Sequence, residues 1–225
     1  NAKMNQSLRI KAGNVTLDGE LALPGNAKGL VIFSHGSGSS RFSPRNNFVA
    51  QHFRDRGFGT FLFDLLTREE DEHYDNRFNI DLLSGRLVEV TNLVCKLPSV
   101  QDLPTGFFGA STGAASAIVA ASELKDHIKA IVSRGGRPDL AMGSLALIKS
   151  PILLIVGSLD DQVLLLNRQA LENVQATKSL KIVDGATHLF EEPGKLEEVA
   201  LLSGDWFEKY LVSQSAFHIQ VNKGT

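Results

Sequence analysis

This sequence of 225 residues has only one cysteine, no long apolar run and almost no excess of charge of one sign. The single cysteine, Cys95, cannot form a disulfide within the chain and favours a reducing compartment. No apolar run approaches the roughly 20 residues that a transmembrane helix needs. The polar segment 1–9 also lacks the apolar core of a signal peptide. These absences predict a cytoplasmic protein without a membrane partner.

The charge balance excludes a further class of partner. The chain has 23 basic and 25 acidic residues and a formal net charge of -2, so it has no general basic surface for nucleic acid. Its content of 43% hydrophobic and 21% charged residues is typical of a globular protein. A chain of this length suits one α/β domain. We therefore expect a single domain over residues 1–225, with a polar tail over 214–225.

The order of the apolar segments predicts the fold class. Residues 7–12 and 15–23 alternate apolar and polar side chains around Gly13-Asn14, which indicates a β-hairpin. Short apolar runs, typical of strands buried on both faces, then alternate with segments of helical periodicity. The predicted strands are 29–34, 60–63, 105–110, 128–132, 151–156 and 180–183. The predicted helices are 44–56, 81–97, 112–124, 138–147, 163–174 and 193–211. This alternation predicts an α/β fold, in which helices cover both faces of a mainly parallel sheet.

A candidate nucleophile follows the third of these strands. Gly109-Ala110-Ser111-Thr112-Gly113 is a Gly-x-Ser-x-Gly motif. The motif alone is weak, but here it joins an apolar strand to a helix of small residues, which is the context that a nucleophile elbow requires. The flanking glycines remove the Cβ atoms that would clash in so tight a turn. We therefore predict Ser111 as the nucleophile; the alternative is a strand-to-helix turn without chemistry.

Residues suited to activate a serine follow two later strands. His188 is the candidate general base, which would take the Ser111 proton and return it to the leaving group. Asp160 is the candidate acid that would orient the imidazole. Its neighbour Asp161 is the rival, since one of the two is expected to cap the following helix, and Asp64 is a more remote choice. Because parallel strands end at one edge of a sheet, these side chains are expected to meet there.

The loop His35-Gly36-Ser37-Gly38 follows the first parallel strand and suits an oxyanion hole. Such a hole needs two backbone N–H donors, which we assign to Thr112 and to Ser37 or its neighbour. His35 and Gly36 are expected to contact the substrate from the same loop. The loop lacks the third glycine of a dinucleotide motif and the Gly-Lys-Ser/Thr of a P-loop, so we expect no cofactor. No metal-ligand spacing occurs either, so we expect no metal.

Four motifs taken together resemble the dienelactone-hydrolase-like branch of the α/β-hydrolases. They are HGSGSS (35–40), GASTG (109–113), GSLDDQV (157–163) and GATHLFEEPG (185–194), and the resemblance extends from about Leu8 to Leu211. It implies an eight-stranded, mostly parallel sheet with one antiparallel strand near the N-terminus, and it favours Asp160 over Asp161. Dienelactone hydrolases carry a cysteine nucleophile, whereas this elbow holds Ser111. Cys95 lies instead on a predicted helix, where we expect it to pack in the core.

These residues predict a serine hydrolase that cleaves a small carboxylic ester or lactone through an acyl-enzyme. The short interval 133–150 leaves no room for a large lid, which favours small substrates. Arg41 and Arg134 are candidate contacts for a substrate carboxylate, with Arg45 as a further choice, and Leu189 is a candidate wall of the acyl site. Ion pairs and core packing are the alternative roles. The charge-rich segment 68–75 is interpreted as a solvated loop.

Two other classes of function use the same sequence features. A protein with this fold can bind a ligand or partner without catalysis, because fold does not fix function. An acyltransferase or a peptidase would use the same nucleophile, acid and base. The joint presence of nucleophile, acid, base and oxyanion loop favours a hydrolase over a binding protein. The sequence indicates no oligomeric state.

Overall fold

The computed structural model describes residues 3–211, so the predicted polar tail over 214–225 lies outside the described residues. The strands are β1 (Met4–Ala12), β2 (Val15–Leu23), β3 (Leu30–Ser34), β4 (Gly59–Phe63), β5 (Thr105–Ala110), β6 (Ile128–Arg134), β7 (Ile152–Gly157) and β8 (Lys178–Val183). The α-helices are α1 (Pro44–Asp55), α2 (Arg68–Asp71), α3 (Ile80–Val94), α4 (Thr112–Leu124), α5 (Met142–Leu145), α6 (Asp161–Leu171) and α7 (Lys195–Tyr210). Short 3-10 helices are η1 (Tyr74–Phe78), η2 (Lys125–His127) and η3 (Pro138–Ala141). Within residues 3–211, none of the helices has the length and apolarity that crossing a membrane requires.

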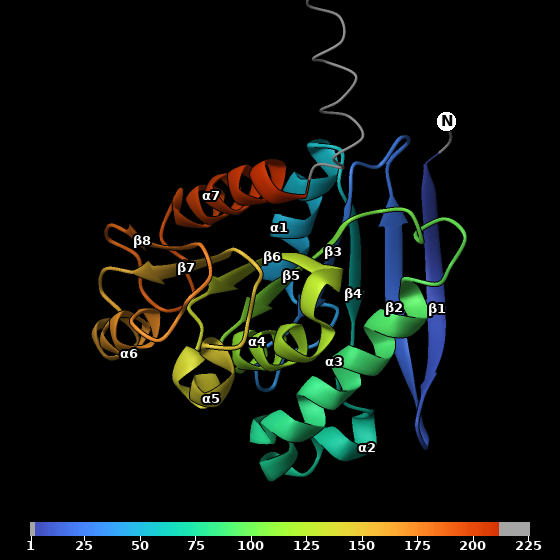
Figure 1. Ribbon diagram of the computed structural model, residues 1–225, viewed down its shortest axis with the longest axis horizontal. Helices are drawn as coiled ribbons and strands as arrows, with labels where there is room; N and C mark the ends of the chain where they lie inside the picture. Colours follow the sequence, from blue (N-terminus) through green and yellow to red (C-terminus); the bar gives the residue numbers. More distant parts are fainter. Residues whose placement is uncertain (1–2, 212–225) are drawn as a thin grey trace, which may run out of the picture.

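The eight strands form one open sheet in the order β1-β2-β4-β3-β5-β6-β7-β8. Strand β2 runs antiparallel to β1 and β4, and every other neighbouring pair is parallel. The parallel strands are joined by helical crossovers, which place α1 and α7 on one face of the sheet and α3 and α4 on the other (Figure 1). The predicted α/β fold, with its N-terminal hairpin and one antiparallel strand, is confirmed.

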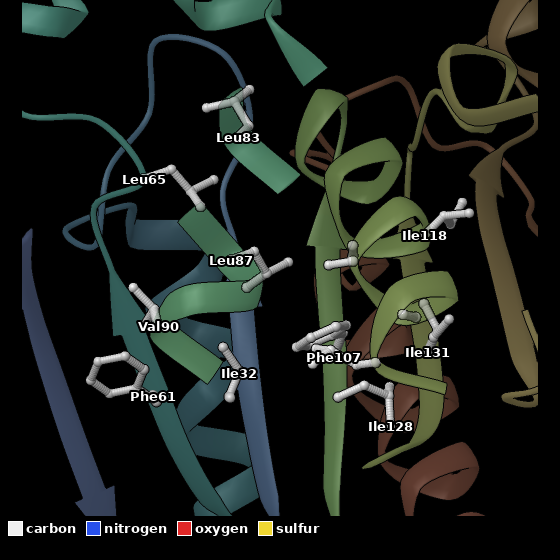
Figure 2. Packing of buried hydrophobic residues seen from close by; sticks show 14 of the residues in the cluster. Ile32, Phe61, Leu65, Leu83, Leu87, Val90, Phe107, Ile118, Ile128 and Ile131 are labelled. Atoms are coloured by element: carbon white, nitrogen blue, oxygen red, sulfur yellow. The ribbon is translucent and has the colours of Figure 1, made fainter. Parts of the chain in front are cut away.

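Side chains from the two faces of the sheet form two separate hydrophobic clusters. In β5 the alternation of side chains sends Phe107 to the face of α3 and α4, and Phe108 to the face of α1 and α7. Figure 2 shows the first cluster, where Leu87 and Val90 of α3 pack toward Ile32 of β3. Burial on both faces explains why the central strands are continuous apolar runs in the sequence.

The second cluster is built around an aromatic side chain of α1. The Phe53 ring has no exposed surface, and its centroid lies 5.7 Å from that of Phe108 and 5.3 Å from that of Phe207 of α7. Phe33 of β3 adds a third ring, 5.8 Å from Phe53. These contacts join both helices of this face to the central strands.

The segment after β4 differs from the solvated loop predicted over residues 68–75. Helix α2 begins there with a capping box: the Glu70 N–H donates to Thr67 Oγ1 at 3.1 Å, and the Thr67 N–H donates to Glu70 Oε1 at 3.0 Å. Arg86 of α3 donates to both oxygens of Glu70, at 2.8 and 2.6 Å, and these bonds lower the pKa of that carboxyl. The segment is largely exposed, as predicted, but it forms α2 and the start of η1 rather than a loop, because local capping and the ion pairs of Glu70 and Asp71 order it.

Replacing Phe53 by alanine should lower the free energy of unfolding by about 3–5 kcal/mol, since a buried aromatic side chain is lost and a cavity remains. Urea denaturation would measure the change. Leu201→Ala, at a position of α7 that is 59% exposed, is the control and should change stability by no more than about 0.5 kcal/mol. Equal, small effects at both positions would contradict the packing described for the aromatic cluster.

Candidate active site

Ser111 stands at a sharp turn between β5 and α4. Its backbone has φ 52° and ψ −123°, a region that residues other than glycine rarely adopt. Glycine is required on both sides of it. A Cβ at position 109 would lie 2.6 Å from the Ala114 Cα, and a Cβ at position 113 would lie 2.1 Å from the Ser34 carbonyl oxygen. The Gly-x-Ser-x-Gly spacing therefore lets α4 start directly against β3 and β5, with Ser111 at the sheet edge.

The Ser111 hydroxyl begins a chain of hydrogen bonds across three loops. Ser111 Oγ lies 3.0 Å from His188 Nε2, and His188 Nδ1 lies 2.6 Å from Asp160 Oδ2. With a carboxylate on Nδ1, the imidazole proton belongs on that nitrogen, which leaves Nε2 free to accept from the serine hydroxyl. The Asp160 side chain is only 14% exposed, whereas that of His188 is 40% exposed. The structure thus brings together the three predicted residues in the order that proton transfer requires.

The two rival carboxylates lie elsewhere. Asp161 is the first residue of α6, where its charge suits the helix dipole. Asp160 occupies the N-cap position of that helix, but its side chain makes no capping hydrogen bond and contacts His188 instead. Asp64 accepts the Arg41 N–H at 2.7 Å and also pairs with the Arg41 guanidinium.

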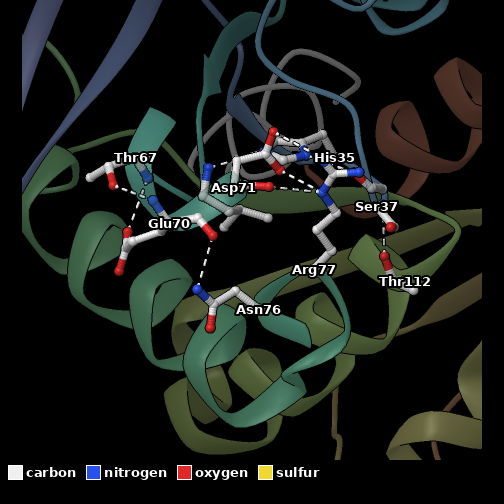
Figure 3. Close-up of polar contacts among 10 residues, drawn as sticks. His35, Ser37, Thr67, Glu70, Asp71, Asn76, Arg77 and Thr112 are labelled. Carbon is white, nitrogen blue, oxygen red and sulfur yellow. Dashed lines mark hydrogen bonds and ion pairs between the residues drawn. The ribbon is translucent and has the colours of Figure 1, made fainter. Parts of the chain in front are cut away.

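The loop after β3 meets the start of α4 beside Ser111. The Ser37 N–H donates to Thr112 Oγ1 at 2.9 Å, a contact drawn in Figure 3. Gly36 packs so closely on the turn that a Cβ there would lie 3.1 Å from the Ser111 Cβ. The two predicted oxyanion donors, Ser37 and Thr112, are therefore neighbours. A negatively charged oxygen at this point would share the Ser37 N–H with the Thr112 hydroxyl or displace that hydroxyl.

The side chain of His35 anchors this loop through contacts with the main chain. Its Nε2 accepts the Leu65 N–H at 3.0 Å, and its Nδ1 lies 2.9 Å from the Gly36 carbonyl oxygen, so both ring nitrogens are engaged with the main chain. The ring is 8% exposed, and burial lowers the pKa of His35, which favours the neutral imidazole that this pair of bonds requires. His35 therefore joins the oxyanion loop to the segment that follows β4.

The other predicted substrate contacts, Arg41, Arg134 and Leu189, have different surroundings. Arg41 is tied to Asp64, and its guanidinium lies 4.1 Å from the centre of the exposed Phe42 ring. Arg134, at the end of β6, is buried beside the histidine loop, where its guanidinium faces the Phe190 ring at 5.9 Å. Leu189 is half-buried next to His188.

Several polar residues that support the site were not predicted from the sequence. In the histidine loop, Glu192 Oε1 accepts the Thr187 N–H at 3.1 Å and also pairs closely with the Thr187 hydroxyl. Asn167 of α6 is fully buried, and its Nδ2 donates to the Gly136 carbonyl at 3.0 Å. Beside the oxyanion loop, Arg77 binds Asp71 with an Nε–Oδ1 distance of 3.0 Å (Figure 3). Asn167 and Gly136 are 31 residues apart, so no local sequence pattern could have revealed that pair. Arg77 and Asp71 are only six residues apart, and Thr187 and Glu192 only five, so these two pairs had a short spacing in the sequence.

Several known proteins are similar to this chain in sequence, in fold or in both. Residues 17–209 match the model of the Dienelactone hydrolase family. A solved dienelactone hydrolase from Anabaena variabilis ATCC 29413 is 48% identical, with a TM-score of 0.90 and coverage of 93% of this chain and 99% of that chain. Est1E from Butyrivibrio proteoclasticus shares the fold at 16% identity and a TM-score of 0.78, and the match covers 90% of this chain and 98% of that chain.

Two curated proteins of Mycobacterium tuberculosis, from strains CDC 1551 / Oshkosh and H37Rv, are each 49% identical over 207 residues. Both bear the name "Putative phosphoribosyl transferase". The match covers 92% of this chain and 47% of theirs, so the chain spans about half the length of these curated relatives.

Gly113→Ala should destabilise the protein by about 3 kcal/mol or more, because the new methyl group would meet the backbone of β3 at 2.1 Å. Gly85→Ala is the matched control. Gly85 lies on the exposed side of α3 with open space around its Cα, so alanine should stabilise that helix by about 0.5–1 kcal/mol. Thermal unfolding would compare the two variants. A Gly113→Ala protein as stable as the parent would show that the turn is looser than described.

Proposed function

The chain belongs to the dienelactone hydrolase family, and we propose that it hydrolyses a small carboxylic ester or lactone through an acyl-enzyme formed on Ser111. The observation that carries this proposal is the continuous chain of hydrogen bonds from Asp160 through His188 to the Ser111 hydroxyl. Membership in a hydrolase family supports an enzyme with a small-molecule substrate. The proposal goes beyond that membership in two respects: the nucleophile is a serine, and the substrate is an ester or a lactone.

In the proposed reaction, Ser111 Oγ attacks the substrate carbonyl while His188 Nε2 takes the hydroxyl proton. Asp160 stabilises the resulting imidazolium, and the backbone N–H groups of Thr112 and Ser37 donate to the negatively charged carbonyl oxygen. The tetrahedral intermediate collapses when His188 returns the proton to the leaving alkoxide, which gives the alcohol and an acyl-Ser111. Water, deprotonated by His188, then releases the acid and restores the serine. In a lactone the alcohol stays attached to the acyl group.

The chain's only cysteine is a poor alternative nucleophile. Cys95 follows the last residue of α3 and lies against Thr105, with 3.5 Å between Sγ and Oγ1. Thr105 starts β5 whereas Ser111 follows its end, and a strand of this length separates them by roughly 20 Å. Burial also raises the pKa of the Cys95 thiol, which disfavours the reactive thiolate. Unlike a thiol, the Ser111 hydroxyl needs a general base, so activity should depend strongly on His188.

Among the predicted substrate contacts, the proposal keeps Gly36, Leu189 and Arg134 near the acyl group. His35 and Arg41 support the oxyanion loop instead, because both ring nitrogens of His35 contact the main chain and the Arg41 guanidinium pairs with Asp64, although its Nε has no hydrogen-bond partner. The single cysteine also favours action in a reducing compartment, which we take to be the cytoplasm. We infer that the residues of this chain act as one hydrolase unit.

The transferase name of the two mycobacterial relatives raises a second activity. This chain, of which residues 17–209 match the hydrolase family model, is similar to only 47% of each relative. We infer that phosphoribosyl transfer, where those relatives perform it, belongs to the half that this chain does not match. No residue described above favours such a transfer here.

Turnover of 4-nitrophenyl acetate by the purified protein would test the proposed hydrolysis. Ser111→Ala should abolish it, and Asp160→Asn should lower kcat by roughly 10⁴-fold because the imidazole loses its orienting carboxylate. Asp161→Asn is the matched control, one residue away on the helix, and should stay within about twofold of the parent.

A larger loss for Asp161→Asn than for Asp160→Asn would contradict the assignment of the acid. Absence of turnover in well-folded protein would favour the reading as a binding protein, and transfer of the acetyl group to an added alcohol in preference to water would favour an acyltransferase.

A further inference from the structure

Strand β1 forms an open edge of the sheet. It is the first strand in the sheet order, and among residues 3–211 it pairs with β2 alone (Figure 1). The backbone N–H and C=O groups on its other side therefore have no strand partner in this part of the chain. Such an edge can accept a further strand, which binds through main-chain hydrogen bonds.

An apolar groove lies beside this edge, on the face of the sheet that α3 covers. Its volume is about 320 Å³, and β1 and the C-terminal end of α3 form its walls. Leu93 of α3 is 41% exposed there, so an apolar side chain in the groove would remove apolar surface from water. The apolar residues that line the groove are Leu8, Ile10, Leu93, Val94 and Leu97.

The opposite face of β1 is basic. Because side chains alternate along a strand, Arg9 and Lys11 lie on the face away from Leu8 and Ile10, which pack with the cluster under α3. The strand contains no acidic residue. Arg9 has an Nε–Oδ1 distance of 3.5 Å to Asp18 of β2, but 80% of its side chain is exposed. Within the described part of the chain, Lys11 forms no ion pair.

These two faces define the kind of strand that would fit. Side chains of an added strand continue the two rows of β1, so one row would lie over the groove and the other beside Arg9 and Lys11. The first row favours apolar residues, and the second favours acidic ones, because opposite charges on neighbouring strands stabilise the pair. A second copy of β1 fits poorly, since antiparallel pairing would gather the basic residues of both strands on one face.

We propose that the free edge of β1, together with the groove between β1 and α3, binds an extended segment of a partner protein in which acidic and apolar residues alternate. Main-chain hydrogen bonds to β1 would hold the segment, and the alternation would select it. The surface does not depend on the proposed hydrolysis, so Ser111→Ala should bind the same segment as tightly as the parent does.

Short synthetic peptides labelled with fluorescein would test the surface by fluorescence anisotropy. In the acidic peptide glutamate alternates with valine, and in the basic peptide lysine replaces every glutamate. The protein should bind the acidic peptide at least about tenfold more tightly, because its charges are opposite to those of Arg9 and Lys11. A third peptide has the composition of the acidic one but keeps its glutamates and valines in separate blocks. It should bind at least about fivefold more weakly than the acidic peptide, since it cannot match both faces.

Variants of the protein locate the binding. Arg9→Gln combined with Lys11→Gln removes the two exposed charges and should bring the affinities for the acidic and basic peptides to within about twofold of each other. Lys181→Gln, on β8 at the other edge of the sheet, is the matched control and should leave the preference unchanged. Leu93→Asn should weaken binding of the acidic peptide at least about fivefold, whereas Leu201→Asn, on exposed surface of α7, should not.

Hydrogen exchange would show whether the acidic peptide adds as a strand. A saturating concentration should slow amide exchange in β1 at least about fivefold and leave β8 unchanged, because the peptide bonds to the free edge of β1. Binding without this protection, or equal affinity for the acidic and basic peptides, would overturn the proposal. Absence of binding, with self-association once Arg9 and Lys11 are both replaced by Gln, would show that these charges only prevent pairing between copies.

Discussion

The strained backbone of Ser111 is the constraint on which the rest of the site depends. A residue with a Cβ holds a positive φ between β5 and α4 only because glycines at positions 109 and 113 let three segments of main chain come into contact. The strain is supported by a close-packed core on both faces of the sheet, where Phe107 and Phe108 lie on opposite sides of the same strand. The packing of β5 and α4 thus fixes the direction of one hydroxyl group.

The other parts of the site reach that hydroxyl from neighbouring strand ends. The loop that carries Asp160 and the loop that carries His188 are in close contact: a Cβ at Gly157 would lie 2.2 Å from the Ala186 carbonyl oxygen. This contact sets the distance between Asp160 and His188, which are 28 residues apart in the chain. The oxyanion loop is held in a similar way by His35 from one side and the Thr112 hydroxyl from the other. Each functional group is therefore positioned by close contacts between neighbouring loops.

Much of this arrangement could be predicted because it depends on local patterns. The apolar runs, the Gly-x-Ser-x-Gly turn and the order of strand ends are readable in the sequence, and they placed Ser111, Asp160 and His188 at one edge. Contacts between side chains that are far apart in the sequence could not be predicted. Arg41 and Arg134 are the same residue type at the same edge, yet only Arg41 meets a carboxylate, which comes from the end of another strand. The sequence contains the Thr67 and Glu70 pattern of a capping box, but the charged residues around it led to the prediction of a loop.

The central claim is that the fold activates Ser111 and no other nucleophile. Labelling the protein with a fluorophosphonate and locating the adduct by mass spectrometry tests this most directly, because the reagent reacts with serines that a base has activated. The account predicts one adduct, on the peptide that contains Ser111, and no adduct in well-folded protein whose His188 is replaced by alanine. Labelling at another residue, or no labelling of the folded parent protein, would contradict it.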